Sequence, residues 1–316
     1  MADGEKVVDS DKVWTVLITN ESYLPGLLTL AYSLRRSPNP SAYPLVALYT
    51  DTLSPAGHAA LDARSIPKQR IEYILPSSSK DYSADPRFYD CWSKLAPFSL
   101  TQYSRVVQLD ADMLVLPSQT MDELMTLPLD PPSLKGSGSR VFAAGHACVC
   151  NPLKKPHYPP DWTPQNCAFT SQHSWGALRA STEAISPSAG GPLGYMNGGL
   201  QVVNPCKEIW EQILSYMEKE AVNMDFADQS LLSGLYRDRW VPLPYTYNAL
   251  KTLRWKGVHD AIWSDHHVKN VHYILAPKPW DEKPEDAKDE SHAWWHQLNK
   301  ERHEEEKKSG IPEDGF

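Results

Sequence analysis

The sequence has few cysteines, no long hydrophobic run and no excess of basic residues. Five cysteines among 316 residues are few and odd in number, which argues against a disulfide scaffold. The longest apolar stretches are far shorter than the roughly 18–20 residues of a transmembrane helix. Lysine and arginine total 31 against 39 acidic residues, so we expect neither nucleic-acid binding nor membrane attachment. The polar N-terminus lacks the basic and apolar regions of a secretory signal, so we expect a cytoplasmic protein with reduced thiols.

The composition is that of a globular protein, with 41% hydrophobic and 22% charged residues. The length suits one large domain or two modest ones. Eleven tryptophans and fifteen tyrosines form a heavy aromatic load. Aromatic residues can line carbohydrate or nucleobase sites, but they are more often part of the core.

The first 110 residues alternate between strand-like and helix-like segments. Residues 13–19 (VWTVLIT) are continuously apolar or β-branched, which is typical of a strand buried on both faces. Further strands are predicted at 45–49, 70–75 and 105–109, with helices at 24–35, 54–64 and 90–103. This alternation predicts a Rossmann-like α/β domain with a mostly parallel central sheet and helices on both faces.

The chain is less regular beyond residue 117. Residues from about 130 to 192 are rich in Pro, Gly, Ser and Trp with little periodicity, and we interpret them as a long insert or lid. Strand patterns resume at 141–144, 199–203 and 270–274, and helix patterns at 205–219 and 228–236. We expect one domain over residues 1–282. The charged residues 283–316 should form a solvated helix or a frayed tail.

An aspartate pair follows the strand predicted at 105–109. Ligands of an open parallel sheet bind beyond the carboxyl ends of its strands, and residues two apart can point the same way. Asp110 and Asp112 could therefore converge on a hard cation such as Mn²⁺ or Mg²⁺, which can hold the phosphates of a nucleotide. A pair of turn or capping aspartates is the alternative, and the pair alone leaves the two interpretations balanced.

A histidine and a lysine near the end of the domain add to this pattern. His272 lies in a predicted strand, six residues before Lys278. The two could supply an imidazole ligand and an ammonium group to the same diphosphate. Taken alone, a buried core histidine is the more common case.

Seven short motifs follow one another between residues 13 and 282. They are TNESYLPG at 19–26, WSKL at 92–95, LDADMLV at 109–115, YMNGGL at 195–200, ADQ at 227–229, YN at 247–248 and HYILAPKPW at 272–280. In this order they resemble glycosyltransferase family 8, the retaining sugar transferases that include glycogenin and galactinol synthase. Each motif alone is modest, but seven in order are specific.

The resemblance implies a GT-A fold and a metal-dependent hexosyltransferase with a UDP-sugar donor. It implies Asp110, Asp112 and His272 as metal ligands, and Lys94, Asp228 and Gln229 as catalytic residues at the donor sugar. Tyr23 should stack on uracil and Lys278 should pair with the diphosphate. The full set expected around the metal and UDP-hexose is Thr19, Asn20, Tyr23, Lys94, Asp110, Ala111, Asp112, Asn197, Gly198, Asp228, Gln229, His272 and Lys278.

The family retains anomeric configuration by one of two routes. Double displacement needs a nucleophile beside the anomeric carbon, and Asp228 and Gln229 are the candidates by motif. In the front-face route, which we favour, the leaving diphosphate accepts the proton of the acceptor. Galactose and glucose both stay open as the donor sugar. A polyol, sugar or glycan is the expected acceptor, and a homodimer is plausible from the family.

The sequence follows the galactinol synthase branch more closely than glycogenin. Residues 146–150 (HACVC) followed by Cys167 are similar to a cysteine-bearing insert of that branch, and His272-Tyr273 also follows it. Leu275 stands where glycogenin has a glycine that lets backbone approach phosphate. Residues 249–255 contain no tyrosine, so self-glucosylation there is not expected.

The cysteines and histidines around the insert allow two interpretations. His146, Cys148, Cys150 and Cys167, with His157 and His173 nearby, could form a zinc site. Their spacing is not that of a standard zinc knuckle, so reduced thiols packed under the insert are the favoured interpretation.

Other functions remain to be weighed against a sugar transferase. A nucleotidyltransferase or sugar-nucleotide hydrolase should show a glycine-rich phosphate loop near the first strand, which residues 19–26 do not supply. A non-catalytic or hydrolytic UDP-sugar-binding protein on the same fold is the second alternative. The presence of both aspartates, His272 and Lys278 argues against lost catalysis.

Overall fold

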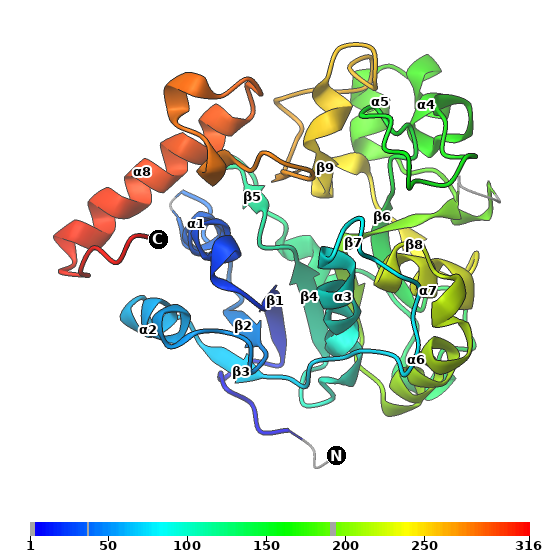
Figure 1. The fold of residues 1–316 in the computed structure, drawn as a ribbon, viewed down its shortest axis with the longest axis horizontal. Coiled ribbons are helices and arrows are strands. Elements are labelled where there is room, and N and C mark those ends of the chain that lie inside the picture. The colour runs from blue at the N-terminus through cyan, green and yellow to red at the C-terminus, as the bar shows by residue number, and fades with distance from the viewer. Residues whose placement is uncertain (1–3, 37, 190–193) are drawn as a thin grey trace.

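The computed structural model describes residues 4–36, 38–189 and 194–316, and a seven-stranded sheet forms its centre (Figure 1). The strand order is β3-β2-β1-β4-β7-β6-β8. Strands β3, β2, β1 and β4 are parallel, β7 is antiparallel to both neighbours, and β6 is parallel to β8. The strands are β1 (Lys12–Ile18), β2 (Leu45–Tyr49), β3 (Lys68–Arg70), β4 (Arg105–Leu109), β6 (Phe142–His146), β7 (Met196–Val203) and β8 (Val241–Pro242). The predicted α/β class with a mostly parallel sheet is confirmed.

Strand β1 is buried on both faces of the sheet. Trp14 and Val16 pack with helix α1 in one apolar cluster, whereas Val13 packs with Leu100 and Tyr103 in another. Successive side chains of a strand point to opposite faces, so a continuously apolar run suits this central position. The apolar pattern of residues 13–19 therefore predicted the environment of the strand correctly.

Helices cover both faces of the sheet (Figure 1). Helices α6 and α7 pack on each other and on the part of the sheet that contains β6 and β7. The α-helices are α1 (Leu24–Arg35), α2 (Pro55–Ala63), α3 (Arg87–Cys91), α4 (Ala168–Ser171), α5 (Ala177–Thr182), α6 (Lys207–Glu220), α7 (Ala227–Leu235) and α8 (His292–Lys308).

A small second sheet has the order β5-β10-β9. Strand β5 (Met113–Val115) follows Asp112 directly and is antiparallel to β10 (Asn270–His272), which is parallel to β9 (Ala249–Leu250). In this register His272 lies opposite Met113. The sheet therefore brings a residue near the end of the domain beside the aspartate pair.

The predictions for the strand at 70–75 and the helix at 90–103 are wrong in extent. The strand predicted at 70–75 is β3, which ends at Arg70 because its only neighbour, β2, ends at the paired Tyr49. The helix predicted at 90–103 is α3 followed by a 3₁₀ segment at Trp92–Ser99. Pro97 lies inside that segment, and its missing N–H group disfavours a continuous α-helix.

The insert is built from short helices that share a core with later residues. Helices α4 and α5 are only four and six residues long. Trp162, Cys167 and Phe169 pack in one apolar cluster with Leu253 and Ile262. Figure 1 shows α4 and α5 beside the segment that contains β9. Positions 190–192 of the predicted insert lie outside the described residues.

The charged C-terminal segment contains helix α8, which packs against α1 (Figure 1). Trp295, Leu298 and Arg302 are buried on its inner side. Of the two outcomes expected for residues 283–316, the helix therefore forms, and one side of it is covered. Within the described ranges, no helix combines the length and apolar character needed to cross a bilayer.

Candidate active site

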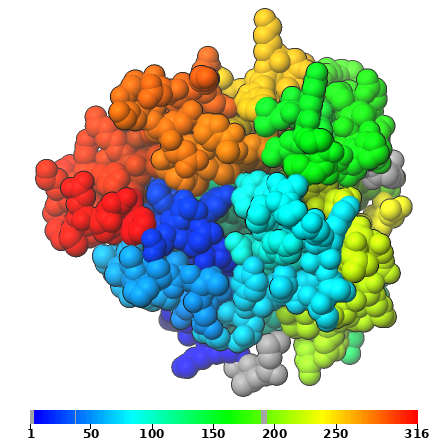
Figure 2. Space-filling view, in the orientation of Figure 1, coloured from blue at the N-terminus to red at the C-terminus, as the bar shows by residue number. Residues whose placement is uncertain are grey.

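A cavity of about 250 Å³ opens at the carboxyl ends of β1 and β4. Its walls come from segments that are far apart in the sequence: the residues after β1 and β4, helix α3, the insert, the start of α7 and the residues around β10. On the face shown in Figure 2, the insert (green) and the segment before α8 (orange) lie against the N-terminal residues (blue) and the segment with α3 (cyan). This is the place where an open parallel sheet is expected to bind its ligand.

Nearly all the residues that the sequence predicts around the metal and UDP-hexose line this cavity. Gly198 is the one predicted residue that does not line it. The lining members are Thr19, Asn20, Tyr23, Lys94, Asp110, Ala111, Asp112, Asn197, Asp228, Gln229, His272 and Lys278.

Two carboxylates and an imidazole meet on one wall of the cavity. His272 Nε2 lies 3.2 Å from Asp112 Oδ1 and 3.6 Å from Asp110 Oδ2, and one ligand atom from each residue lies within 4.8 Å of the others. Oxygen and imidazole ligands suit Mn²⁺ or Mg²⁺. The donor set therefore fits the divalent cation that the sequence implies.

A chain of amide groups fixes the orientation of His272. Its Nδ1 lies 2.8 Å from Asn248 Oδ1, and Asn248 Nδ2 donates to Asn197 Oδ1 at 2.8 Å. Because Asn248 presents an oxygen, Nδ1 donates a proton to it, and Nε2 faces the two carboxylates. Outer hydrogen bonds of this kind orient metal-binding histidines. Asn248 belongs to a motif that the sequence analysis recognised but to which it gave no role.

Two buried ammonium groups balance the carboxylates. Lys94 Nζ donates to Asp110 Oδ2 at 2.9 Å, and Lys278 Nζ donates to Asp112 Oδ2 and to the backbone oxygen of Tyr273. Burial by itself would raise the pKa of Asp112, but Lys278 and His272 hold that pKa well below its usual range. Burial would lower the pKa of Lys94, but the nearby carboxylates raise it above its ordinary value. Asp112 and Lys94 therefore both stay charged at neutral pH.

Asp228 is a buried carboxyl group at the start of α7. Only 1% of it is exposed, and its Oδ2 accepts one hydrogen bond from Gln201 Nε2, at 3.3 Å. Burial raises its pKa to about 7, with Asp110 adding to the rise and Lys94 opposing it. Ala227, the preceding residue, has a φ of +41°, a strained conformation for a residue with a side chain. The fold therefore holds this group in place at a cost in stability.

Two glycines let side chains approach the strand β7 closely. A Cβ atom on Gly198 would lie 2.2 Å from Asp228 Oδ2, and one on Gly199 would lie 2.3 Å from His272 Cε1. Gly198 N also donates to Gln229 Oε1 at 2.8 Å. Gly198 therefore does not line the cavity, but its missing side chain leaves room for Asp228, which does.

The residues predicted for nucleoside binding lie together at the end of β1. Asn20 Oδ1 accepts a hydrogen bond from Ser22 N at 3.1 Å and so caps the short turn at Glu21–Tyr23. Thr19 Oγ1 donates to Asp90 Oδ2 at 3.1 Å. The Tyr23 ring packs edge-on against Trp280, with centroids 5.9 Å apart. These contacts hold an aromatic ring at the mouth of the cavity.

An aromatic wall lines the side of the cavity formed by the insert. Trp162 stacks on Phe226 with centroids 4.4 Å apart, and Tyr158 meets Phe226 edge-on at 5.2 Å. All three residues line the cavity, as do Arg87 and Asp90. None of these five residues was predicted from the sequence. For the three aromatic residues, the only indication was the high aromatic content of the chain, which does not distinguish a binding site from a hydrophobic core.

Leu275 keeps the backbone conformation that a glycine would favour. Its φ is +64°, in the left-handed region that residues with side chains seldom adopt. It also lines the cavity. From the sequence alone, a leucine in place of the glycine puts the phosphate contact in doubt. The backbone nevertheless follows the path that a glycine would take here.

Comparisons with known proteins agree with this geometry. The family model described as glycosyl transferase family 8 matches residues 14–283. Galactinol synthase 2 of Solanum lycopersicum is 27% identical over 278 residues, which cover 87% of this chain and 74% of that protein. Galactinol synthase 1 of Arabidopsis thaliana is 27% identical over 300 residues, covering 92% and 79%.

Solved structures with the same fold include two glycosyltransferases. An active-site mutant of LgtC gives a TM-score of 0.58 at 15% identity and covers 92% of this chain and 95% of that chain. The bifunctional glycosyltransferase WbbM in its apo form gives 0.60 at 15% identity, and the match covers 95% of this chain and 52% of that one. Because the family model spans most of the sequence and these neighbours share its architecture, the chain is a glycosyltransferase with a GT-A fold and belongs to glycosyltransferase family 8.

Proposed function

We propose that this glycosyltransferase moves galactose or glucose from a UDP-sugar to the hydroxyl of an acceptor, with retention of anomeric configuration and with Mn²⁺ or Mg²⁺. The observation that carries the proposal is the meeting of Asp110, Asp112 and His272 at the cavity, with ligand atoms within 4.8 Å of one another. The similarity to galactinol synthases supports a hexose donor. It also supports a small polyol or sugar as acceptor.

The charges of the site favour joint binding of the cation and the diphosphate. Lys94 and Lys278 already balance Asp110 and Asp112, so a divalent cation alone would leave a local positive excess. A nucleoside diphosphate supplies the compensating negative charge. We therefore expect UDP to bind much more tightly with Mn²⁺ than without it, and Mn²⁺ to bind more tightly with UDP.

In the proposed mechanism the protein contributes mainly charge stabilisation and positioning. Asp110, Asp112 and His272 would hold the divalent cation, which would supply positive charge to the diphosphate leaving group. Lys278 pairs with the same diphosphate, and Tyr23 offers its ring to the uracil. Lys94 and Asp228 hold the hydroxyls of the donor sugar. The buried position of Asp228 excludes water from its side of the sugar.

The contacts of Gln229 and Asp228 are consistent with the front-face route. Gln229 Oε1 accepts the backbone N–H of Gly198, and this bond orients its amide. Asp228 has a pKa of about 7 because of burial, so at neutral pH a large fraction is protonated and poorly nucleophilic. We therefore favour proton transfer from the acceptor to the leaving diphosphate. In that route Asp228 acts as a hydrogen-bonding group.

The aromatic wall is the proposed acceptor side. Trp162, Phe226 and Tyr158 line the same cavity as the candidate metal ligands, and aromatic faces pack on the C–H surfaces of sugar and polyol rings. The wall belongs to the insert and to the start of α7. Acceptor choice should therefore change with the insert, while donor binding should not.

A donor screen tests the function. The protein is incubated with UDP-galactose, UDP-glucose and other UDP-sugars with Mn²⁺, and release of UDP is measured with inositol, simple sugars or proteins as acceptor. We expect one hexose donor to be turned over faster with a polyol or sugar acceptor, with an α-linked product by NMR. Equal UDP release with and without every acceptor would identify a hydrolase. Metal-dependent UDP binding by calorimetry without turnover would identify a non-catalytic binding protein.

Replacement of Asn248 by alanine tests how His272 is oriented. Without the acceptor at Nδ1, the imidazole loses its fixed tautomer, and the affinity for the metal should fall about 10–100-fold. The Mn²⁺ concentration for half-maximal activity should rise by that factor, while kcat at saturating Mn²⁺ changes little. Asn39→Ala, at an exposed asparagine, is the matched control. An unchanged Mn²⁺ dependence in Asn248→Ala would show that the amide does not orient the ligand.

A further inference from the structure

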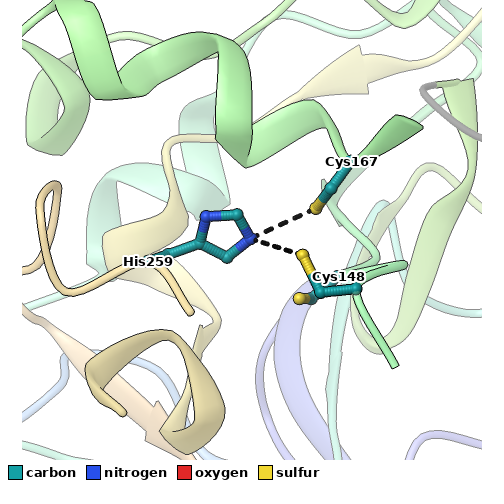
Figure 3. Close-up of side chains that lie close together, drawn as sticks. Cys148, Cys167 and His259 are labelled. Carbon is teal, nitrogen blue, oxygen red and sulfur yellow. Dashed lines mark hydrogen bonds between the residues drawn. The ribbon is translucent and has the colours of Figure 1, made fainter. Parts of the chain in front are cut away.

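A second group of potential metal ligands lies behind the insert. Cys148, Cys150, Cys167 and His259 each place one Sγ or Nε2 atom within 4.8 Å of the others. Figure 3 shows Cys148, Cys167 and His259 pointing toward one another. The three cysteines were candidates from the sequence, but the histidine comes from a loop about ninety residues further along the chain.

The histidines considered from the sequence lie elsewhere. His146 Nε2 contacts the backbone oxygen of Ile185 at 2.9 Å, and His157 packs edge-on against Tyr158. His173 lies next to His259 but outside the group of sulfur atoms. Three of the cysteines considered from the sequence therefore belong to this group, whereas its imidazole is that of His259, which the sequence analysis did not consider because nothing in the spacing indicated that residue 259 folds back onto the insert.

Two distances within the group are close to those between neighbouring ligands of a zinc ion. His259 Nε2 lies 3.1 Å from Cys150 Sγ and 3.3 Å from Cys167 Sγ. Zinc bonds of about 2.0–2.3 Å place neighbouring ligand atoms roughly 3.5 Å apart. His259 Nε2 carries at most one proton, so it cannot form full hydrogen bonds to both sulfur atoms. A metal ion at the centre of the group would bind all four ligand atoms at once.

A further contact fits a metal-bound imidazole. His173 Nε2 lies 2.9 Å from His259 Nδ1. When Nε2 of a histidine binds a metal, Nδ1 carries the proton and donates it to an outer acceptor, which fixes the ring. His173 is in the position of that acceptor.

The group is also largely buried and rich in sulfur. His259 is fully buried, Cys167 is 1% exposed and Cys150 is 9% exposed, while Cys148 is partly buried at the cavity wall. Four sulfur and nitrogen donors in a closed site are typical of structural zinc, whereas a catalytic zinc keeps an open position. We propose that Cys148, Cys150, Cys167 and His259 bind one structural Zn²⁺.

This ion would tie the insert to the wall of the active site. Cys148 lines the cavity, as do Asn151 and Pro152 just after the second thiol. Helices α4 and α5 are too short to be stable alone, and a structural metal supplies folding free energy to such segments. The zinc would therefore hold the aromatic residue Trp162 in place without taking part in the chemistry.

Metal analysis tests the site without any use of activity. The protein is purified under reducing conditions and its zinc content is measured by mass spectrometry. We expect about one zinc per chain in the unchanged protein and less than about 0.1 in Cys167→Ser, because a structural site of this kind rarely survives the loss of a thiolate. Cys206→Ser removes a buried thiol that contacts Pro132 and Glu208 instead, and it should keep the zinc.

A second variant shows whether the measured zinc is bound at the thiolate site or at the carboxylate site. Asp112→Asn should leave the zinc content unchanged, because the proposed ligands do not include Asp112. If zinc were lost in Asp112→Asn and kept in Cys167→Ser, the metal would lie at the carboxylate site and the proposal would be wrong.

X-ray absorption at the zinc edge needs no variant and therefore covers the case in which Cys167→Ser fails to fold. We expect three sulfur ligands at about 2.3 Å and one nitrogen ligand at about 2.0 Å. A purified protein with five titratable thiols and no zinc would show that the cysteines only pack together. Fewer than five titratable thiols without zinc would indicate a disulfide. Either result would overturn the proposal.

Discussion

Replacing Asp112 by asparagine should abolish metal-dependent turnover. Asp112 contacts His272 Nε2 with one carboxylate oxygen and Lys278 Nζ with the other. An amide at this position supplies a weaker ligand and no negative charge. We expect kcat to fall at least about 10³-fold, equivalent to about 4 kcal/mol of lost transition-state stabilisation. The same change at Asp110, which pairs with Lys94, should have a similar effect.

Binding measurements separate this loss from a folding defect. Calorimetry with UDP should show Mn²⁺-enhanced binding to the unchanged protein and no enhancement in Asp112→Asn. Asp62→Asn removes an exposed aspartate that pairs with Lys68, and it should keep both binding and turnover. Full Mn²⁺-dependent activity in either Asp110→Asn or Asp112→Asn would falsify the metal assignment.

The elements that the sequence predicted well are those with strong local patterns. Residues 45–49 and 105–109 form β2 and β4 at the predicted bounds, because each is a short apolar run that becomes a buried central strand. The strand predicted at 199–203 begins earlier, at Met196. The sequence pattern did not indicate this earlier start, because neither asparagine nor glycine, at positions 197 and 198, favours a strand.

The position of His272 depended on pairing that has no local signal. Strand β10 has only three residues and is held by β5 and β9, which have three and two. The strand predicted at 270–274 contains β10, but its partners β5 and β9 are too short to carry a pattern that predicts them. The family motif gave the histidine a role, and the register of His272 with Met113 shows physically how the chain brings it to Asp112.

Arg87 and Asp90, which the sequence did not predict, lie in the short helix α3, and the other missed residues belong to segments with irregular structure. Trp162, Phe226 and His259 lie in turns or at a helix start, and each reaches its neighbours through contacts between distant segments. Single-sequence periodicity cannot report such contacts, since it describes only which face of a regular element is apolar.

Asp228→Asn should lower activity and raise stability at the same time. The variant loses the carboxyl group proposed to hold the donor sugar, so we expect kcat to fall about 10²-fold or more. An asparagine oxygen can still accept the hydrogen bond from Gln201 Nε2 that Asp228 accepts at 3.3 Å. The buried amide avoids the cost of an ionised carboxylate, which is the usual conflict between stability and function at an active site.

The stability gain has a defined dependence on pH. Burial raises the pKa of Asp228 from an ordinary 3.8 to about 7, so between these values the folded protein binds a proton that the unfolded chain does not. The contribution of Asp228 to stability is therefore fully present below pH 3.8 and is lost as the pH rises to about 7. Asparagine has no such dependence.

We therefore expect the melting temperatures of the two proteins, measured without added Mn²⁺, to be close at pH 4 and to separate as the pH rises. Above pH 7 the variant should be more stable by up to about 4 kcal/mol, the energy of a three-unit shift in pKa. Asp62→Asn, at an exposed position, should show no such trend. Equal melting temperatures of Asp228→Asn and the unchanged protein from pH 4 to pH 8 would mean that Asp228 is fully compensated when ionised. Its carboxylate would then be stable enough at neutral pH to serve as a nucleophile, and the double-displacement route would become the better explanation.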